Sequence, residues 1–359
     1  MTPDLASRIP DVAVVGGGLL GRLLAWRAAR AGMHVSLYEA GGRLGEGSAA
    51  WAAAGMITPA AEAVDADAEI VAMGRRSLVL WPQWLAELPL PVFYRDDGTL
   101  LVWHREDAGE ARRFEAMLKA RDDAAAPTRL DGRQLAALEP ALEGRFPQAM
   151  VLAGEAWVDN REALAAVAAG LDEAGVDCHW CATVGEGERP AAGIVVDCRG
   201  MGARRDWVGL RGVRGEVVRL HAPEVHLTHM LRLLHPRYAV YVAPRAEGRL
   251  VVGATVIESD DRSGVSVRGA LELLSSAYSM LPALAEARIL EFSTQVRPAL
   301  PDNRPAFRFD RERNVLRING LYRHGFLLSP AVVEAALKWL GGADAGWDCL
   351  HAEEAAVCL

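Results

Sequence analysis

The glycine-rich segment at residues 16–21 constrains the fold of this chain more than any other feature. The apolar run Val12–Val15 precedes it and predicts a strand buried on both faces, as in a parallel sheet. Leucines and alanines at helical spacing follow, and Gly32 stands where a helix commonly ends. A second strand is predicted over residues 35–38 and ends at Glu39. The first forty residues therefore predict a complete β-α-β unit.

Each glycine of this Gly-x-Gly-x-x-Gly motif has a physical role in binding a dinucleotide. Gly16 permits the tight turn, Gly18 lets the backbone approach a pyrophosphate, and Gly21 lets the helix pack closely on the strand. The helix N-terminus offers free N–H groups to the phosphates. Glu39 can accept hydrogen bonds from an adenosine ribose. The motif predicts a dinucleotide site; the alternative is a glycine-rich turn without a ligand.

The composition excludes several classes of protein. A length of 359 residues suggests two or three lobes, and 51% hydrophobic against 24% charged residues excludes a disordered chain. The formal net charge of −8 argues against nucleic-acid binding, which needs a basic surface. Lys119 and Lys338 are the only lysines among 39 basic residues, so few candidates exist for a lysine Schiff base.

The cysteines and the apolar segments favour a reduced, cytoplasmic chain without a membrane span. Five cysteines are an odd number and a poor disulfide framework. Cys178 and Cys181 form a C-x-x-C on a predicted strand, where residues three apart face opposite sides, so we expect a structural role and no metal site. No signal peptide is visible before Asp11, and the apolar window 49–64 falls short of the roughly 20 apolar residues of a membrane span.

Three later segments also carry small residues where a cofactor could pack. Ser48–Met56 is rich in alanine and glycine, although a small-residue helix packed on its neighbour is the alternative. A buried strand that ends near Gly200 is predicted in the middle of the chain. Near the C-terminus, the pattern predicts a strand over residues 315–320 and a loop over residues 321–328. Ser329 as N-cap and Pro330 as first residue then predict a helix that continues over residues 331–340.

These segments occur in the order found in the D-amino-acid oxidase-like flavoproteins, and the chain resembles most the glycine oxidases of thiamine biosynthesis. The resemblance spans essentially the whole chain, and its motifs are Gly16–Glu39, Ser48–Pro59, Gly215–Glu216, Tyr241–Pro244, Val251–Thr255, Val296–Pro298 and Gly320–Pro330. It implies an α/β (α+β overall) fold, in which a Rossmann-like FAD-binding domain joins a substrate domain with a large mixed or antiparallel sheet. The FAD should be noncovalent, because no cysteine lies near residues 298–305.

The resemblance also implies a division of the chain and a set of cofactor-binding positions. The FAD-binding domain is expected over residues 1–88, 148–212 and 297–359, and the substrate-binding domain over 89–147 and 213–296. The expected cofactor-binding residues are Gly16, Gly18, Gly21, Glu39, Ser48, Ala49, Ala54, Gly55, Met56, Gly200, Gly320, Arg323, His324, Gly325, Phe326 and Leu327.

The inserts between the cofactor segments should build the substrate domain. Residues 91–103 predict a β-hairpin around an Asp-Asp-Gly turn. Residues 105–123 predict a solvated helix, 130–142 a short helical stretch and 161–175 a helix with one apolar face.

In the family that the chain resembles, the flavin carries out the reaction, and the protein binds and orients the substrate. Arg297 follows a strand pattern and precedes Pro298, and the resemblance implies that it binds the substrate carboxylate, for which a guanidinium is well matched. Tyr241 should share this carboxylate, and Arg323 should close the pocket or face the flavin. The alternatives are a half-buried sheet tyrosine and surface arginines. No protein side chain is assigned a certain catalytic role.

The expected reaction is oxidation of glycine, or a similar small amino acid or amine, to the imine. The imine would give glyoxylate or a keto acid and ammonia, or supply the thiazole of thiamine, and O2 would become H2O2. A D-amino-acid oxidase or dehydrogenase with a larger substrate is the alternative, and an RNA-modifying module of the same fold is disfavoured by the acidic composition. The expected partners are the small substrate and O2, with no nucleic acid, and with homo-oligomerisation left open.

Overall fold

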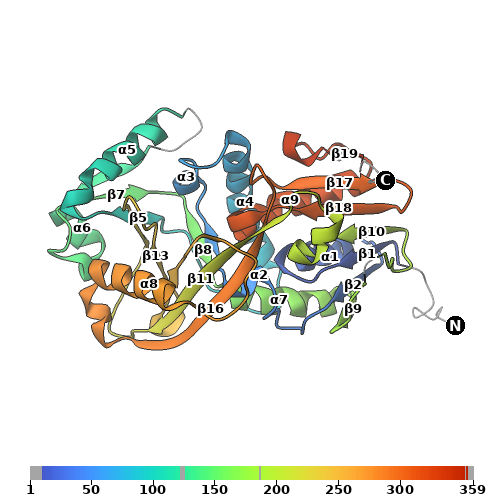
Figure 1. Cartoon of the computed structure of the whole chain (residues 1–359), viewed down its shortest axis with the longest axis horizontal. Helices are drawn as coiled ribbons and strands as arrows, with labels where there is room; N and C mark the ends of the chain where they lie inside the picture. The colour runs from blue at the N-terminus through green and yellow to red at the C-terminus, as the bar shows by residue number, and fades with distance from the viewer. Residues whose placement is uncertain (1–9, 122–125, 186, 352, 355–359) are drawn as a thin grey trace.

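The chain, seen in a computed structural model that describes residues 10–121, 126–185, 187–351 and 353–354, has three β-sheets surrounded by helices (Figure 1). The first is a seven-stranded sheet with the order β19-β17-β18-β10-β1-β2-β9. Its strands are β1 Val12–Val15, β2 Val35–Glu39, β9 Asp177–Trp180, β10 Ile194–Asp197, β17 Ala306–Asp310, β18 Val315–Asn319 and β19 Glu353–Glu354. Because β1 lies between β2 and β10 and is parallel to both, its carboxyl end opens at a crevice suited to a ligand.

Four helices share one apolar core with this sheet. They are α1 Leu19–Arg30, α4 Ala68–Ala86, α7 Asn160–Glu173 and α9 Gly325–Leu340. The predicted β-α-β unit is confirmed: β1, α1 and β2 follow one another, and Gly32, just after the helix, has a φ of +90° that favours glycine.

The second large sheet has nine strands and lies on the left of Figure 1 with α5, α6 and α8. Its order is β15-β11-β14-β13-β12-β5-β7-β6, and β16 also pairs with β11. Its strands are β5 Thr99–Val102, β6 Thr128–Asp131, β7 Gln148–Leu152, β11 Arg211–His221, β12 Met230–Leu233, β13 Tyr241–Pro244, β14 Arg249–Gly253, β15 Ile257–Glu258 and β16 Arg288–Ala299. The helices beside it are α5 Ala108–Lys119, α6 Gly132–Leu138 and α8 Val267–Met280.

A third sheet has the order β3-β8-β4, with strands β3 Met56–Ile57, β8 Ala156–Val158 and β4 Tyr94–Arg95. The short helices α2 Ala49–Ala52 and α3 Pro59–Glu62 flank β3 in the chain. The division into two domains stays a proposal. Strand β7 belongs to the nine-stranded sheet, whereas the proposed division puts residues 148–212 in the cofactor domain.

The hairpin predicted over residues 91–103 is wrong. Strand β4 pairs with β8, whereas β5 pairs with β7 and β12, so the two segments belong to different sheets. The turn between them is real, because Gly98 has a φ of +94°, but its amide donates to Glu155 instead of closing a hairpin. The helical stretch predicted over residues 130–142 is partly wrong, because Thr128–Asp131 is a strand and the helix starts at Gly132.

The C-terminal helix starts earlier than the sequence predicts. Ser329 and Pro330 were expected to cap a helix over residues 331–340, but α9 begins at Gly325 and both residues lie inside it. Proline lacks the N–H that would bind the carbonyl four residues earlier, which belongs to Phe326. The buried Trp81 indole of α4 donates to this carbonyl at 2.8 Å, so the missing hydrogen bond is replaced from another helix.

Two further features concern the chain's chemistry. Cys178 is half-buried on β9, Cys181 is exposed just after it, and both are free thiols.

Over the described ranges, no helix is long and apolar enough to cross a membrane, and no group of three or more His, Cys, Asp or Glu side chains could hold a metal ion.

We expect Trp81→Phe to lower the free energy of unfolding, because it leaves a buried carbonyl without a donor, at a cost of about 1–3 kcal/mol. In Trp81→Phe/Pro330→Ala, residue 330 regains an N–H for the same carbonyl, so part of the loss should return. Denaturant unfolding of the two single variants, the double variant and the wild type measures this coupling. If the effects of the two single variants simply add in the double variant, the Trp81 indole does not replace the hydrogen bond that Pro330 cannot make.

Candidate functional site

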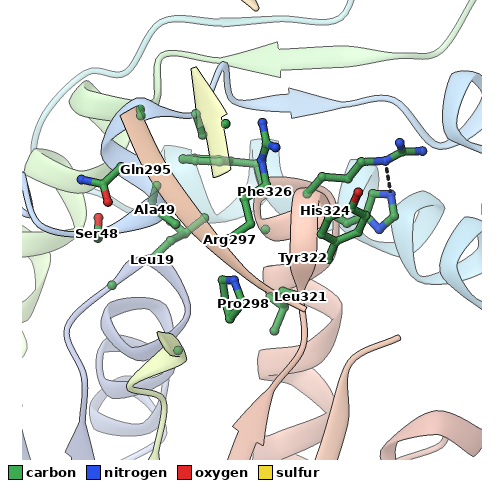
Figure 2. Close-up of a pocket in the computed structure, with 18 of the residues that line it drawn as sticks. Leu19, Ser48, Ala49, Gln295, Arg297, Pro298, Leu321, Tyr322, His324 and Phe326 are labelled. Atoms are coloured by element: carbon green, nitrogen blue, oxygen red, sulfur yellow. Dashed lines mark hydrogen bonds between the residues drawn. The ribbon is translucent and has the colours of Figure 1, made fainter. Parts of the chain in front are cut away.

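A cavity of about 500 Å³ is lined by segments from both large sheets (Figure 2). One end is formed by the turn after β1 and by residues 47–58. The other end is formed by residues of β11, β12, β13 and β16 of the nine-stranded sheet, by Ala254 and Val256 after β14, and by residues 318–329 before and within α9. The cavity therefore collects the sequence segments that were expected to bind a cofactor and a substrate.

The first end is built by the glycines of the β1–α1 turn. Gly16 has a φ of +101°, and a Cβ there would lie 2.6 Å from the backbone carbonyl of Cys198. A Cβ on Gly18 would meet nothing closer than Ser48 Cβ at 3.9 Å, so it would take up cavity space. Gly18 is the N-cap of α1 and supplies no capping side chain, and the first turn holds no acidic residue. The free N–H groups and the helix dipole there suit a pyrophosphate.

Glu39 lines the cavity and shapes the same turn. Its carboxylate accepts hydrogen bonds from the amides of Gly17 at 2.5 Å and Gly41 at 2.6 Å. Each carboxylate oxygen has a second lone pair, so these contacts leave acceptors for a ribose.

Arg22 also organises this turn, and our sequence interpretation missed it. The side chain is fully buried and donates to the carbonyls of Gly17 at 2.5 Å, Arg43 at 2.7 Å and Leu164 at 3.2 Å. Burial lowers the pKa of Arg22 to about 10, which leaves it charged at neutral pH. The available signal was an arginine directly after Gly21 in an otherwise apolar helix turn.

The alanine-rich segment packs its backbone against the protein and lines the cavity. Asn160 donates to the carbonyls of residues 50 and 51 at 2.7 and 2.8 Å, and Arg245 donates to Ala54 at 2.5 Å. Gly55 has a φ of +64°, and a Cβ there would overlap a carbonyl oxygen of β8. Close backbone packing therefore requires glycine at position 55, and the segment lines the cavity with small side chains against which a ring system could pack.

The second end brings Arg297 and Tyr241 over one face of the nine-stranded sheet. Arg297 comes from β16 and Tyr241 from β13. A Cβ on Gly215 of β11 would overlap the Arg297 guanidinium, and one on Gly253 of β14 would lie 2.6 Å from the Tyr241 hydroxyl. Glycines on neighbouring strands thus open the space in which these two side chains lie.

The electrostatics of this pair suit a carboxylate ligand. Arg297 uses Nη1 to donate to the carbonyl of Thr255 at 3.1 Å, which leaves the other guanidinium N–H groups for a ligand. Burial lowers the pKa of Arg297 and raises the pKa of Tyr241. The arginine starts far above neutral pH and the tyrosine moves further from it, so both groups act as hydrogen-bond donors.

Arg323 lines the cavity but is held by acidic partners. Its Nη2 lies 2.8 Å from Glu62 Oε2 and 3.1 Å from Asp65 Oδ2, and His324 Nε2 lies 2.9 Å from the same Glu62 oxygen. Burial disfavours the Glu62 carboxylate, but Arg323, His324 and Arg232 outweigh it and hold its pKa well below the usual range. Glu62 was not predicted, because nothing in the local pattern after Pro59 distinguishes it.

Most of the predicted site residues meet in this cavity. The cofactor positions that line it are Gly16, Gly18, Glu39, Ser48, Ala49, Ala54, Gly55, Met56, Gly200, Arg323, His324, Gly325 and Phe326.

Gly21, Gly320 and Leu327 do not line the cavity. A Cβ on Gly21 would overlap the Gly16 carbonyl oxygen, which fits its predicted packing role, and Gly320 has a φ of +84°. Leu327 is buried against Gly74 of α4. Tyr322, which lines the cavity next to His324, was not predicted.

Glu155 is a buried carboxyl next to α3, the helix whose Glu62 lines the cavity. It is fully buried, and its Oε1 accepts from the Ala61 amide at 2.6 Å. Burial raises the pKa of Glu155 from 4.5 to about 7. Between these two values the folded chain holds a proton that the unfolded chain has lost, so raising the pH destabilises the fold.

We therefore expect the unfolding free energy of the wild type to fall from about pH 5 to about pH 8 by roughly 1–3 kcal/mol more than that of Glu155→Gln. The amide keeps an acceptor for Ala61 and cannot ionise. Chemical denaturation across this range makes the comparison, with the exposed Glu143→Gln as the control. Parallel pH profiles for the wild type and Glu155→Gln would contradict the buried, proton-holding carboxyl.

Comparisons with known proteins agree with this geometry. A family model described as FAD dependent oxidoreductase matches residues 11–339. The chain is 42% identical over 321 residues to the putative thiamine biosynthesis oxidoreductase ThiO of Rhizobium etli, covering 89% of this chain and 93% of that protein.

Solved structures share the fold. The crystal structure of glycine oxidase from Geobacillus kaustophilus matches with a TM-score of 0.83 at 25% identity and covers 94% of this chain and 96% of its own. The iminodiacetate oxidase of Chelativorans sp. matches with a TM-score of 0.78 over 93% of this chain and 96% of its own; at 24% identity it shows the fold alone. The mixed α/β fold and the FAD cofactor predicted from the sequence are confirmed, and the chain belongs to the DAO family of FAD-dependent oxidoreductases.

Proposed function

We propose that this chain oxidises glycine, or a small amino acid or amine like it, to the imine, and that the imine serves the synthesis of the thiazole of thiamine. The observation that carries the proposal is the Arg297–Tyr241 pair, placed over Gly215 and Gly253 in the cavity that also holds the dinucleotide turn. The names of the Rhizobium and Geobacillus relatives support the substrate and the pathway.

The residues of the cavity fit FAD, and different residues would hold its different parts. The uncapped N-terminus of α1 at Gly18 would hold the pyrophosphate, Glu39 the ribose, and the small side chains of residues 48–56 the ring system. Bound FAD supplies the acceptor for the hydride of the substrate α-carbon.

The protein's own side chains bind and orient the substrate. The Arg297 guanidinium binds the carboxylate in a bidentate manner, and the Tyr241 hydroxyl donates a further hydrogen bond. Fixing the carboxylate limits the positions that the α-carbon and the amine can take. In the proposed overall reaction the amine loses two electrons and two protons, O2 gains them to become H2O2, and water hydrolyses any imine that is released to glyoxylate and ammonia.

The wider setting of the enzyme is part of the same proposal. We place it in the cytoplasm, which fits the free thiols of Cys178, Cys181, Cys198 and Cys349. Turnover of glycine, sarcosine and D-alanine with peroxide detection tests the oxidase and separates it from a D-amino-acid oxidase. Activity with a quinone but not with O2 would identify a dehydrogenase instead.

We expect Gly18→Val to lose most of its FAD, because the branched side chain fills the space in which the pyrophosphate approaches the backbone. The measurement is the flavin-to-protein absorbance ratio of the purified variant, with release of free FAD by acid. Gly109→Val, at an exposed helix position away from the cavity, is the control and should keep the wild-type ratio. Full flavin content in Gly18→Val would show that this glycine does not have the predicted role in phosphate binding.

We expect Arg297→Ala to keep its FAD but to weaken the apparent affinity for glycine about 10- to 100-fold, because a charged hydrogen-bonded pair is lost. The maximal rate should also fall, since the orientation of the substrate suffers. Arg297→Lys keeps the charge but loses the planar fork, so it should recover only part of the loss. Steady-state kinetics make the comparison; wild-type constants in Arg297→Ala would place the carboxylate elsewhere, with Arg323 as the next candidate.

A further inference from the structure

Arg232 is a buried cation of this cavity that the proposed reaction does not use. It lies on β12, is 9% exposed and lines the cavity. Across the sheet it pairs directly with Tyr241 of β13, and Tyr241 pairs with Gly253 of β14. Residues opposite each other on neighbouring strands present their side chains on the same face, so Arg232 and Tyr241 share the cavity face of the sheet.

Tyr241 stands between Arg232 and Arg297 in the strand order of the sheet, because β13 lies between β12 on one side and β14, β11 and β16 on the other. The Tyr241 hydroxyl lies over Gly253 of β14, on the flank of β13 opposite to β12. The proposed carboxylate site, between this hydroxyl and Arg297, therefore lies on one flank of Tyr241 and Arg232 on the other. Arg232 is therefore placed to bind a ligand group that glycine lacks.

Most of the Arg232 hydrogen-bond donors are unused. Its Nη1 donates to the carbonyl of Ala61 at 3.2 Å, and over the described ranges the guanidinium makes no other hydrogen bond. The nearest acid, Glu62, lies 3.6 Å away through Oε1, beyond hydrogen-bonding distance, while its Oε2 is occupied by Arg323 and His324. The side chain of Arg232 is only 11% exposed, and a guanidinium with free N–H groups in such a place calls for an acceptor from a ligand.

The acidic residues near Arg232 do not supply the missing hydrogen-bond acceptors. Asp65 shares Arg323 with Glu62, but Glu62 offers Arg232 only an ion pair at 3.6 Å and no hydrogen bond. Glu155 lies behind Ala61, and its pKa of about 7 leaves it partly uncharged at neutral pH. Among acceptors, a carboxylate or another small oxyanion best matches the guanidinium in charge and shape.

We propose that Arg232 forms a second anion subsite in this cavity, so that the enzyme takes small amino acids that carry a second acidic group, such as an N-carboxymethyl arm, in addition to glycine. This inference rests on the proposed amino-acid oxidation. It places the first carboxylate on Arg297 and the second acidic group on Arg232.

The test compares two unreactive ligands on the FAD-loaded enzyme. Diglycolate carries two carboxylates around an ether oxygen, and methoxyacetate is the same ligand with one carboxylate. Binding is followed by the change in the flavin absorbance spectrum, which requires no turnover. We expect diglycolate to bind at least about 10-fold more tightly than methoxyacetate in the wild type. Equal affinities would overturn the proposal without any variant.

Variants assign the difference to Arg232. In Arg232→Met the preference for diglycolate should fall to within about 3-fold, and Arg232→Lys should keep part of it. Arg249→Met, at an exposed arginine outside the cavity, is the matched control and should keep the wild-type preference. A preference that survives in Arg232→Met would refute the subsite.

A turnover experiment separates this inference from the proposed function. Peroxide formation is measured with glycine and with iminodiacetate, whose amine carries two carboxymethyl arms. We expect the ratio of kcat/KM for iminodiacetate to that for glycine to fall about 10-fold in Arg232→Met. If the wild type oxidises glycine but the ratio does not change, the second subsite is wrong and the proposed function stands. If the wild type oxidises no amino acid or amine, the proposed function itself fails.

Discussion

The antiparallel pairing of β11 with β16 is the interaction on which the substrate end of this protein depends. The two strands pair from Arg211 with Ala299 to His221 with Arg288, so their register fixes what faces the cavity. Val213 lies opposite Arg297, and Gly215 is the next residue on the same face of β11. The long guanidinium can therefore lie across the sheet, because the strand beside it has no side chain at that position. A register slip of one residue would turn Arg297 away from the cavity.

The parts of the fold that depend on neighbouring residues could be predicted from the sequence. The apolar run Val12–Val15, the helical spacing after it and the acid at Glu39 are local, and the β-α-β unit formed as predicted. The start of α9 could not be predicted in this way, because Pro330 is tolerated inside the helix through Trp81, a residue far away in the chain. The hairpin at residues 91–103 failed for a similar reason: each strand found its partner in a different sheet.

The candidate site likewise contains residues that could be predicted from the sequence and residues that could not. Arg297 and Tyr241 were identified because they lie in motifs that resemble a known family, and the structure places both on the cavity. Glu62 and Arg232 carry no such motif. Their positions acquire meaning only from the fold, in which α3 brings Glu62 to Arg323 and the register of β12 with β13 sets Arg232 beside Tyr241. Chemistry that depends on cross-strand neighbours cannot be read from one strand.

Arg232, Arg297 and Arg323, which all line the cavity, differ in what already neutralises them. Arg323 is held by Glu62 and Asp65, so its charge is largely spent within the protein. Among the described residues, Arg297 donates to a backbone carbonyl alone, which carries no net charge, and Arg232 forms an ion pair with Glu62 at 3.6 Å, beyond hydrogen-bonding distance. A ligand anion gains most where a buried guanidinium still has free N–H donors, because that group has given up water without gaining hydrogen-bond acceptors in exchange. The carboxylate of a substrate should therefore be drawn to Arg297 before Arg323, and Arg232 is the place where a second acidic group would gain most.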